Sequence, residues 1–188
     1  MKRGRVYRRD ELALHSGAID RDLKTLVELG EVKKAGAGLY YRPRLSRFGQ
    51  LPAEDYELVR SFLKDDDFLL ISPNVYNGLG VGLTQVYNTI IVYNRRRHEH
   101  VMLDGRSFAF KRPRNYPWKL SKEYLFVDLL NNLDLLTEGT TSVKERIKER
   151  MSEMDCGTLL RMARRYGKVA TRVFFENAVR EGSNAVSS

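Results

Sequence analysis

The sequence of 188 residues has only one cysteine and three histidines. A single cysteine, Cys156, excludes an internal disulfide, and so little cysteine and histidine disfavours a structural zinc site. No apolar run approaches the roughly 20 residues of a membrane-spanning helix. The sequence also lacks a GxxxxGK[ST] segment, which disfavours a nucleotide-hydrolysing core. Charged residues, not an apolar signal core, follow the start of the chain, so we expect a cytoplasmic protein with no membrane partner.

Positive charge is what the sequence has in excess. Its 33 Lys and Arg exceed its 24 Asp and Glu, which gives a formal net charge of +9. Residues 1–47 hold 12 basic and 6 acidic residues, and residues 95–119 hold 8 basic and 2 acidic ones. The rest of the chain is therefore slightly acidic. This asymmetry indicates basic faces, for which a polyanion such as nucleic acid is the first partner to test.

The first 45 residues carry the pattern of two helices followed by a hairpin. Residues 10–15 form a short helical run that ends at Ser16-Gly17. Apolar residues then recur at helical spacing over residues 19–29, up to Gly30, and two extended runs follow at residues 31–35 and 39–42. Helix, turn, helix and basic hairpin in this order predict a winged helix-turn-helix.

A winged helix binds duplex DNA by placing its second helix in the major groove, while its wing and arm hold phosphates. The predicted DNA contacts are Ser16, Ala18, Arg21 and Lys24 on the helix, Lys33, Lys34, Arg42 and Arg44 on the wing, and Lys2, Arg3 and Arg5 in the arm. Asp20 and Asp22 favour the first turn of the helix but lower the positive potential there. The alternative is a winged helix used for protein contact, which an uncharged exposed second helix would indicate.

One part of this segment has a more specific pattern. The run Ile19 to Val32, continued by Gly38-Leu39-Tyr40 and Pro43, follows aLxxLvxxGxvxxxxxGlY. In this pattern the chain resembles the AbiEi-type antitoxins of bacterial type IV toxin–antitoxin (abortive infection) systems. Weaker similarity continues from Ile71 to Gly80 and from Val127 to Gly167, so the resemblance spans most of the chain.

The resemblance implies a two-domain transcriptional regulator. Its winged helix would bind the promoter of its own operon, and its carboxy-terminal domain is implicated in antitoxin activity and cooperative DNA binding. The implied partners are double-stranded DNA and a nucleotidyltransferase toxin encoded next to the antitoxin, which it opposes functionally and not necessarily by contact. Family members carry a full helix before the first strand, whereas only three residues precede Gly4 here. Because such a segment alone buries little apolar surface, we expect residues 1–45 to pack on the following domain.

The remainder is predicted to complete an α+β fold, in which the N-terminal winged helix-turn-helix (1–45) is followed by an α/β antitoxin or effector domain (51–180). That domain would contain a small, mainly antiparallel sheet and C-terminal helices. Predicted helices cover residues 53–64, 121–136, 155–166 and 169–180, a short helix starts at Ser72-Pro73, and another starts at the Ser142 to Glu145 capping box. Predicted strands cover residues 68–71, 89–94, 99–103 and 107–111, the last two joined by an Asp104-Gly105 turn. Residues 181–188 have the composition of a flexible tail.

Candidate chemistry is sparse. The alternative to a regulator is a metal-dependent nucleic-acid-processing enzyme with a nuclease-like α/β domain, in which Asp65 to Asp67 or Asp104 would hold metal. The acidic run is, however, typical of a solvated turn, and His98 and His100 share a strand face without an identifiable third ligand. We therefore predict no catalytic residue, no metal and no cofactor.

A second basic surface is predicted to contact a partner or nucleic acid. Its residues are Arg95, Arg96, Arg97, Arg112, Arg114, Tyr116 and Trp118. Interleaved aromatic and basic side chains stack on nucleobases or anchor protein interfaces. Two alternatives stay open: the arginine triplet is a solvated strand end, or Tyr116 and Trp118 cover the edge of the sheet.

Overall fold

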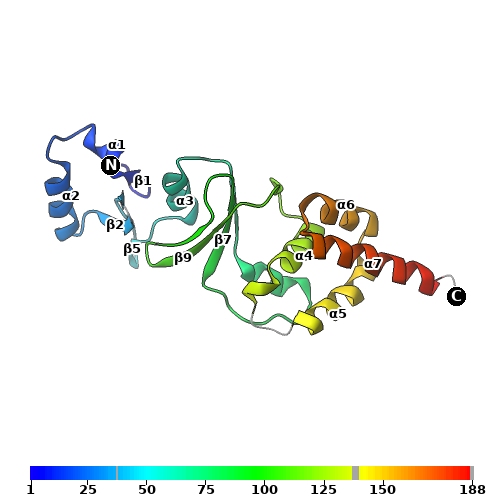
Figure 1. Ribbon diagram of the computed structural model, residues 1–188. Coiled ribbons are helices and arrows are strands. Elements are labelled where there is room, and N and C mark those ends of the chain that lie inside the picture. Colours follow the sequence, from blue (N-terminus) through cyan, green and yellow to red (C-terminus); the bar gives the residue numbers. More distant parts are fainter. Residues whose placement is uncertain (37, 137–139, 187–188) are drawn as a thin grey trace. The chain divides into compact units, whose positions relative to one another are not determined.

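The computed structural model describes residues 1–36, 38–136 and 140–186, and the chain divides into two compact units. Unit 1 comprises residues 1–70 and 88–112, and unit 2 comprises residues 71–87 and 113–188. Helices combine with small antiparallel and mixed sheets, as the predicted α+β class requires (Figure 1). The predicted boundary between residues 45 and 51 falls inside unit 1. Within the described ranges, no helix is long and apolar enough to cross a membrane.

Unit 1 begins with a strand, two helices and two further strands. These are β1 (Val6–Arg8), α1 (Arg9–Ala13), α2 (Ile19–Glu28), β2 (Lys33–Gly36) and β3 (Leu39–Tyr41). The strands pair antiparallel in the order β1-β3-β2, with Val6 opposite Tyr41 and Lys34 opposite Tyr40. Both predicted helices and both predicted extended runs are therefore present. Residue 37, which follows β2 in the sequence, lies outside the described residues.

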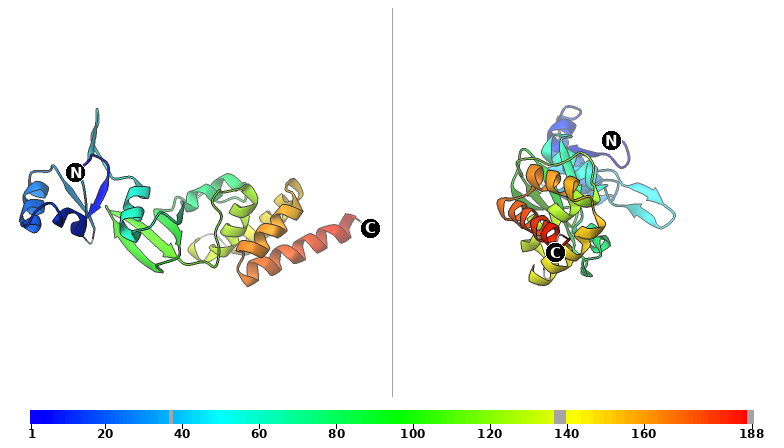
Figure 2. Two further views of the ribbon diagram at one scale, coloured as in Figure 1. Left: turned by 90° about the horizontal axis from the view of Figure 1, so that it is seen from above. Right: turned by 90° about the vertical axis from the view of Figure 1, so that its right-hand side faces the viewer.

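A second hairpin follows β3. Its strands β4 (Arg44–Ser46) and β5 (Gly49–Leu51) pair with Ser46 opposite Gly49, so that Arg47 and Phe48 form a two-residue loop. In Figure 2 this hairpin, in cyan, stands clear of the rest of its unit. The sequence pattern does not predict it, because the segment lacks the Asn-Gly or Asp-Gly pair that marks most two-residue hairpins.

The second half of unit 1 is a helix on a four-stranded sheet. It contains α3 (Asp55–Leu63), β6 (Phe68–Ile71), β7 (Thr89–Asn94), β8 (Glu99–Leu103) and β9 (Arg106–Lys111), with strand order β6-β7-β9-β8. The predicted hairpin β8–β9 is antiparallel, but β7 runs parallel to β9. The sheet is therefore mixed, and the parallel pair β7–β9 is a feature that the predicted, mainly antiparallel sheet did not include.

The chain reversal after β7 explains this arrangement. Asn94 is buried, and its side-chain oxygen accepts hydrogen bonds from the backbone N–H groups of Arg96 and Arg97 at 2.8 and 2.6 Å. Its side-chain nitrogen donates to the carbonyl oxygen of Lys111, at the end of β9, at 3.2 Å. The reversal thus sends β8 to the outer edge, and the Asp104-Gly105 turn returns β9 into the space beside β7.

One hydrophobic core joins the two halves of unit 1. It contains Val6, Leu39 and Tyr41 from the first sheet, Leu58 and Phe62 from α3, and Phe108 and Phe110 from β9. Polar contacts reinforce it, because Ser61 Oγ donates to the carbonyl oxygen of Val6 at 2.9 Å and the Arg8 guanidinium donates to that of Ser61 at 3.0 Å. The expectation that residues 1–45 pack on the segment that follows them is confirmed by this core.

Tyr41 links this core to a titration above neutral pH. Burial, together with the Asp104 carboxylate, raises the pKa of Tyr41 to about 12, whereas an unfolded tyrosine ionises near pH 10. The folded state therefore favours the protonated phenol, and this stabilisation is complete below about pH 10 and is lost as the pH rises towards 12. Between about pH 10 and pH 12, the free energy of unfolding should therefore fall further in the wild type than in Tyr41→Phe. We expect the difference between the two decreases to be about 2 kcal/mol. Urea unfolding from neutral pH to pH 12 measures it, and parallel curves for the two proteins would contradict it.

Unit 2 is built from helices. It contains the 3-10 helices η1 (Pro73–Leu79), η2 (Leu133–Leu135) and η3 (Met151–Glu153), and the α-helices α4 (Lys122–Asn131), α5 (Thr140–Arg150), α6 (Cys156–Tyr166) and α7 (Val169–Val186). The carboxylate of the buried Asp128, in α4, accepts hydrogen bonds from the hydroxyl groups of Tyr76 and Tyr124 at 2.5 and 3.2 Å. This contact fixes η1 on α4.

Two predicted boundaries in unit 2 are wrong. Helix α5 begins at Thr140, so Ser142 lies inside it and is not its N-cap. Val143 and Ile147, one helical turn apart, are both buried, so one face of the helix packs into the core. Helix α7 continues to Val186, past the predicted end at residue 180 and into the predicted tail. Residues 187–188 lie outside the described residues.

Candidate nucleic-acid interface

The basic arm, residues 2–5, is held against the start of the β4–β5 hairpin. The backbone N–H of Gly4 donates to the carbonyl oxygen of Arg42 at 2.8 Å, and Arg3 forms a parallel bridge with the same residue. Gly4 has a φ of 81°, and a Cβ at this position would collide with the Arg44 side chain. Glycine therefore allows Arg44 to cross the arm, and the arm presents its basic side chains from a fixed backbone.

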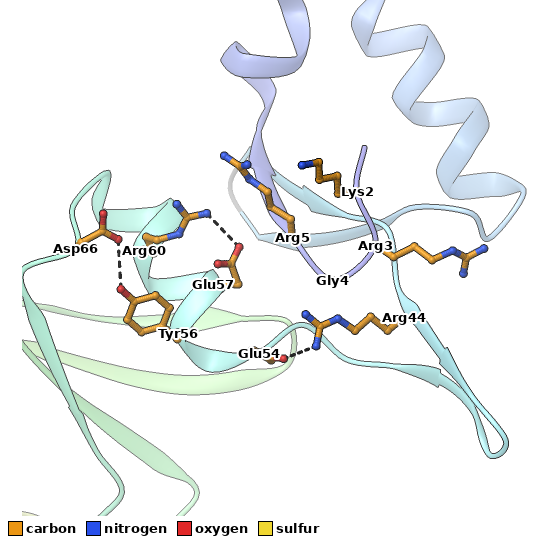
Figure 3. A pocket seen from close by; sticks show the side chains of 10 residues that line it. All are labelled: Lys2, Arg3, Gly4, Arg5, Arg44, Glu54, Tyr56, Glu57, Arg60 and Asp66. Carbon is orange, nitrogen blue, oxygen red and sulfur yellow. Dashed lines mark hydrogen bonds and ion pairs between the residues drawn. The ribbon is translucent and has the colours of Figure 1, made fainter.

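An open pocket of about 560 Å³ lies between this arm and α3 (Figure 3). Its lining has more basic than acidic side chains: Lys2, Arg3, Arg5, Arg44 and Arg60 against Glu54, Glu57 and Asp66, with Gly4 and Tyr56 completing it. Two of the carboxylates are paired, Glu54 with Arg44 at 2.6 Å and Glu57 with Arg60 at 3.1 Å. The predicted arm residues and Arg44 thus gather at one positively charged depression.

The hydroxyl group of Tyr56 lies in the same pocket, 3.4 Å from the Asp66 carboxylate. Partial burial raises the pKa of Tyr56, and the negative charge of Asp66 raises it further. The phenol is therefore a neutral hydrogen-bond donor at physiological pH. The positive charge of the pocket comes from its lysine and arginine side chains.

Helix α2 exposes the two predicted basic contacts. Arg21 has no ion-pair partner among the described residues, and Lys24 lies 4.0 Å from Glu28. Asp20 does not stand free beside them, because its carboxylate accepts two hydrogen bonds from the Arg9 guanidinium, at 2.6 and 2.5 Å. This guanidinium holds the pKa of Asp20 below its ordinary value. The pair thus neutralises one of the two acidic residues that lower the potential at the start of α2.

The predicted contacts Ser16 and Ala18 are half-buried in the turn between α1 and α2. Ser16 Oγ donates to the Asp22 carboxylate at 2.5 Å and accepts from the backbone N–H of Ala18 at 3.1 Å. These contacts hold the turn and give Asp22 a partner. In this conformation the side chain of Ser16 is already occupied.

Lys33 and Lys34 are exposed at the start of β2 and make no ion pair within the described part of the chain. The opposite end of the β2–β3 hairpin is packed, because the carbonyl oxygen of Ala35 accepts from the backbone N–H of Asp104 at 2.6 Å. Arg42 pairs with Glu31 at 3.4 Å. The free positive charge of this hairpin therefore lies at its open end, and not at its turn.

The central arginine triplet meets the acidic run that the sequence suggested as a metal site. Arg95 pairs with Asp67 at 3.0 Å and Arg96 with Asp65 at 2.6 Å. The pKa of Asp65 is lowered by a hydrogen bond from the backbone of Asp67 and by the Arg96 guanidinium. Among the described residues no group of three or more His, Cys, Asp or Glu is placed to share a metal ion.

Arg97 pairs with Glu99 at 2.8 Å and lies 4.6 Å from the ring centroid of Phe62. Together with Arg8, Arg96 and Lys64, it lines a depression of about 690 Å³ at the end of α3. The two basic regions of the sequence therefore meet in unit 1, through Arg8 of the first and the triplet of the second.

The remaining predicted partner residues lie outside regular helices and strands. Arg112 and Arg114 are exposed, Tyr116 is half-buried, and Trp118 has 84% of its surface exposed. The alternative in which Trp118 covers the edge of the sheet is therefore wrong. Arg112 belongs to unit 1, whereas the other three belong to unit 2.

Several residues of the basic surface escaped sequence reasoning. Arg9 neutralises Asp20, and Arg8 and Lys64 line the depression beside the arginine triplet. Arg47 and Phe48 form the loop of the unpredicted hairpin. No family model, curated protein or solved structure matches the chain.

Proposed function

We propose that this chain is a transcriptional regulator whose first 45 residues form a winged helix-turn-helix that binds double-stranded DNA. The observation that carries the proposal is the order strand, helix, helix, strand, strand, with the three strands arranged as β1-β3-β2. In a winged helix the second helix enters the major groove and the hairpin contacts the adjacent backbone. Helix α2 and the β2–β3 hairpin take these two places.

The charges on these elements support the proposal. Arg21 on α2 and Lys33 and Lys34 on β2 are exposed and unpaired among the described residues. The arm adds Lys2, Arg3 and Arg5 beside Arg44. Phosphate contacts from such side chains supply affinity, and Arg21 is the long side chain on α2 best suited to a base edge.

We also propose that the protein is a cytoplasmic antitoxin that represses its own promoter. This part rests on the resemblance to AbiEi-type antitoxins, and it assigns residues 51–180 to antitoxin activity or to assembly on DNA. Expression of a nucleotidyltransferase toxin encoded by a neighbouring gene is expected to stop growth of the host. Co-expression of this chain with the toxin is expected to restore growth. A neighbouring toxin whose effect the chain leaves unchanged would refute the antitoxin assignment without affecting the DNA-binding one.

Titration of the DNA upstream of the encoding gene tests the DNA-binding proposal. We expect a specific complex whose affinity falls steeply with salt, because phosphate contacts release counterions. Arg21→Ala is expected to weaken the specific complex about tenfold while leaving binding to competitor DNA nearly unchanged. Equal affinity of the wild type for the upstream fragment and for unrelated duplex would overturn promoter recognition.

The Asp20–Arg9 pair leads to a prediction in the opposite direction. Asp20→Asn removes a negative charge from the first turn of α2 and releases the Arg9 guanidinium. We expect the variant to bind duplex DNA about threefold to tenfold more tightly at low salt. Glu145→Gln, an equal change of charge at an exposed position of α5, is the control. Tighter binding by both variants would mean that net charge, and not the position of Asp20, determines the effect.

A further inference from the structure

The loop of the β4–β5 hairpin presents one cation and one aromatic ring. Ser46 Oγ accepts from the backbone N–H of Phe48 at 3.1 Å and donates to the carbonyl oxygen of Gly49 at 3.1 Å. Phe48 has 85% of its surface exposed, and the Arg47 guanidinium lies 4.6 Å from the centroid of its ring. The loop is thus held by its own hydrogen bonds while its two side chains project into solvent.

Both faces of this hairpin carry exposed apolar side chains. Leu45 lies opposite Gln50 and Leu51 lies opposite Arg44, so the two leucines are on opposite faces of the ribbon. They are 62% and 42% exposed. An isolated two-stranded ribbon is marginally stable in water, so burial of these side chains against a partner would stabilise the hairpin. The segment from Arg42 to Ala53 contains three arginines and no acidic residue. Arg42 and Arg44 are paired with Glu31 and Glu54, so Arg47 in the loop carries the charge that remains for a partner, and this charge fits an anionic surface better than a neutral or basic one.

The base of the hairpin is joined to the elements of the proposed DNA interface. Gln50 Nε2 donates to the carbonyl oxygen of Gly30, two residues past the end of α2, at 3.0 Å. On the other side, the guanidinium of Arg3, in the arm, donates to the carbonyl oxygen of Pro43 at 3.3 Å. In Figure 3 the hairpin extends from the same side of the unit as Arg3 and the Arg44 side chain.

We infer that the β4–β5 hairpin inserts Arg47 and Phe48 into the minor groove of the DNA, next to the major groove that α2 contacts. The inference rests on the proposed function. A groove about 6 Å wide excludes a helix but admits single side chains. Arginine is attracted to its negative potential, and an apolar ring wedges between base steps and bends the duplex. The hairpin supplies both side chains on a narrow, preformed turn.

Competition with a distamycin-type minor-groove ligand tests this inference on the upstream fragment. We expect the ligand to weaken wild-type binding. Phe48→Ala and Arg47→Ala are each expected to bind about tenfold more weakly, equivalent to about 1.4 kcal/mol, and to lose most of their sensitivity to the ligand. Val86→Ala and Arg180→Ala, exposed positions in unit 2, are the matched controls and are expected to behave as the wild type.

The outcomes separate this inference from the proposed function. If the hairpin variants bind and respond to the ligand as the wild type does, while Arg21→Ala is weakened, the hairpin inference fails and the DNA-binding proposal stands. If the wild type does not bind duplex DNA, the proposed function itself fails. Loss of binding to a protein partner in Phe48→Ala, with DNA affinity unchanged, would assign the hairpin to protein and overturn the inference. Unchanged urea midpoints for the variants establish that the loop residues do not act through folding.

Discussion

Replacing Lys33 and Lys34 together by glutamate is expected to lower the affinity for duplex DNA about a hundredfold at low salt. The expected loss is large because both lysines are exposed and unpaired within the described residues, so no intramolecular carboxylate already offsets their charge. They also lie at the open end of the β2–β3 hairpin, close in sequence to the end of α2. The loss is expected on any sequence, since phosphate contacts carry no base information.

The salt dependence of binding distinguishes a local effect from a general one. A log–log plot of affinity against salt is expected to become shallower by about two for the Lys33 and Lys34 variant, one for each lysine that no longer neutralises a phosphate. Lys144→Glu with Lys168→Glu changes the net charge equally on exposed positions of unit 2 and is the control. If the control loses as much affinity, the protein binds DNA through its overall charge and has no defined interface at the hairpin.

Local signals in the sequence account for much of the fold. The helical spacing of apolar residues locates α2 and α3, and the Asp104-Gly105 turn locates the β8–β9 hairpin, because these features depend on neighbours a few residues away. The parallel pairing of β7 with β9 is different, since it depends on how Asn94 contacts Lys111 across the reversal. No pattern within one strand encodes that choice.

The candidate site shows the same division. The basic residues of the arm, α2 and β2 are identifiable from charge and spacing, but the partners of these charges are not. The pairing of Asp20 with Arg9, and of Asp65 with Arg96, joins residues 11 and 31 positions apart. Such contacts decide which cations are free to bind a phosphate, and they require the tertiary structure. The β4–β5 hairpin lacks the usual turn residues, so its loop was not identifiable as a contact element.

Asp104, which the enzyme hypothesis offers as a metal ligand, connects three parts of unit 1. Its carboxylate accepts hydrogen bonds from Tyr41 Oη at 3.0 Å and from the backbone N–H of Ala53 at 3.3 Å, and it lies 3.4 Å from the Arg106 guanidinium. Its own backbone N–H donates to the carbonyl oxygen of Ala35 at 2.6 Å. The β2–β3 hairpin, the start of α3 and the β8–β9 turn therefore meet at this residue.

Asp104→Ala is expected to lower the free energy of unfolding by about 3 kcal/mol. The substitution leaves the Tyr41 hydroxyl without this acceptor, and it places alanine at a φ of 49°, which alanine adopts less readily than aspartate or asparagine. Asp104→Asn keeps an acceptor oxygen and tolerates this φ, so it is expected to cost only about 1 kcal/mol. Urea unfolding in the presence of a chelator measures both, with the exposed Asp134→Ala as the control. A metal ligand would be dispensable under these conditions, so a metal-free Asp104→Ala protein as stable as the wild type would contradict the connecting role and favour the enzyme hypothesis.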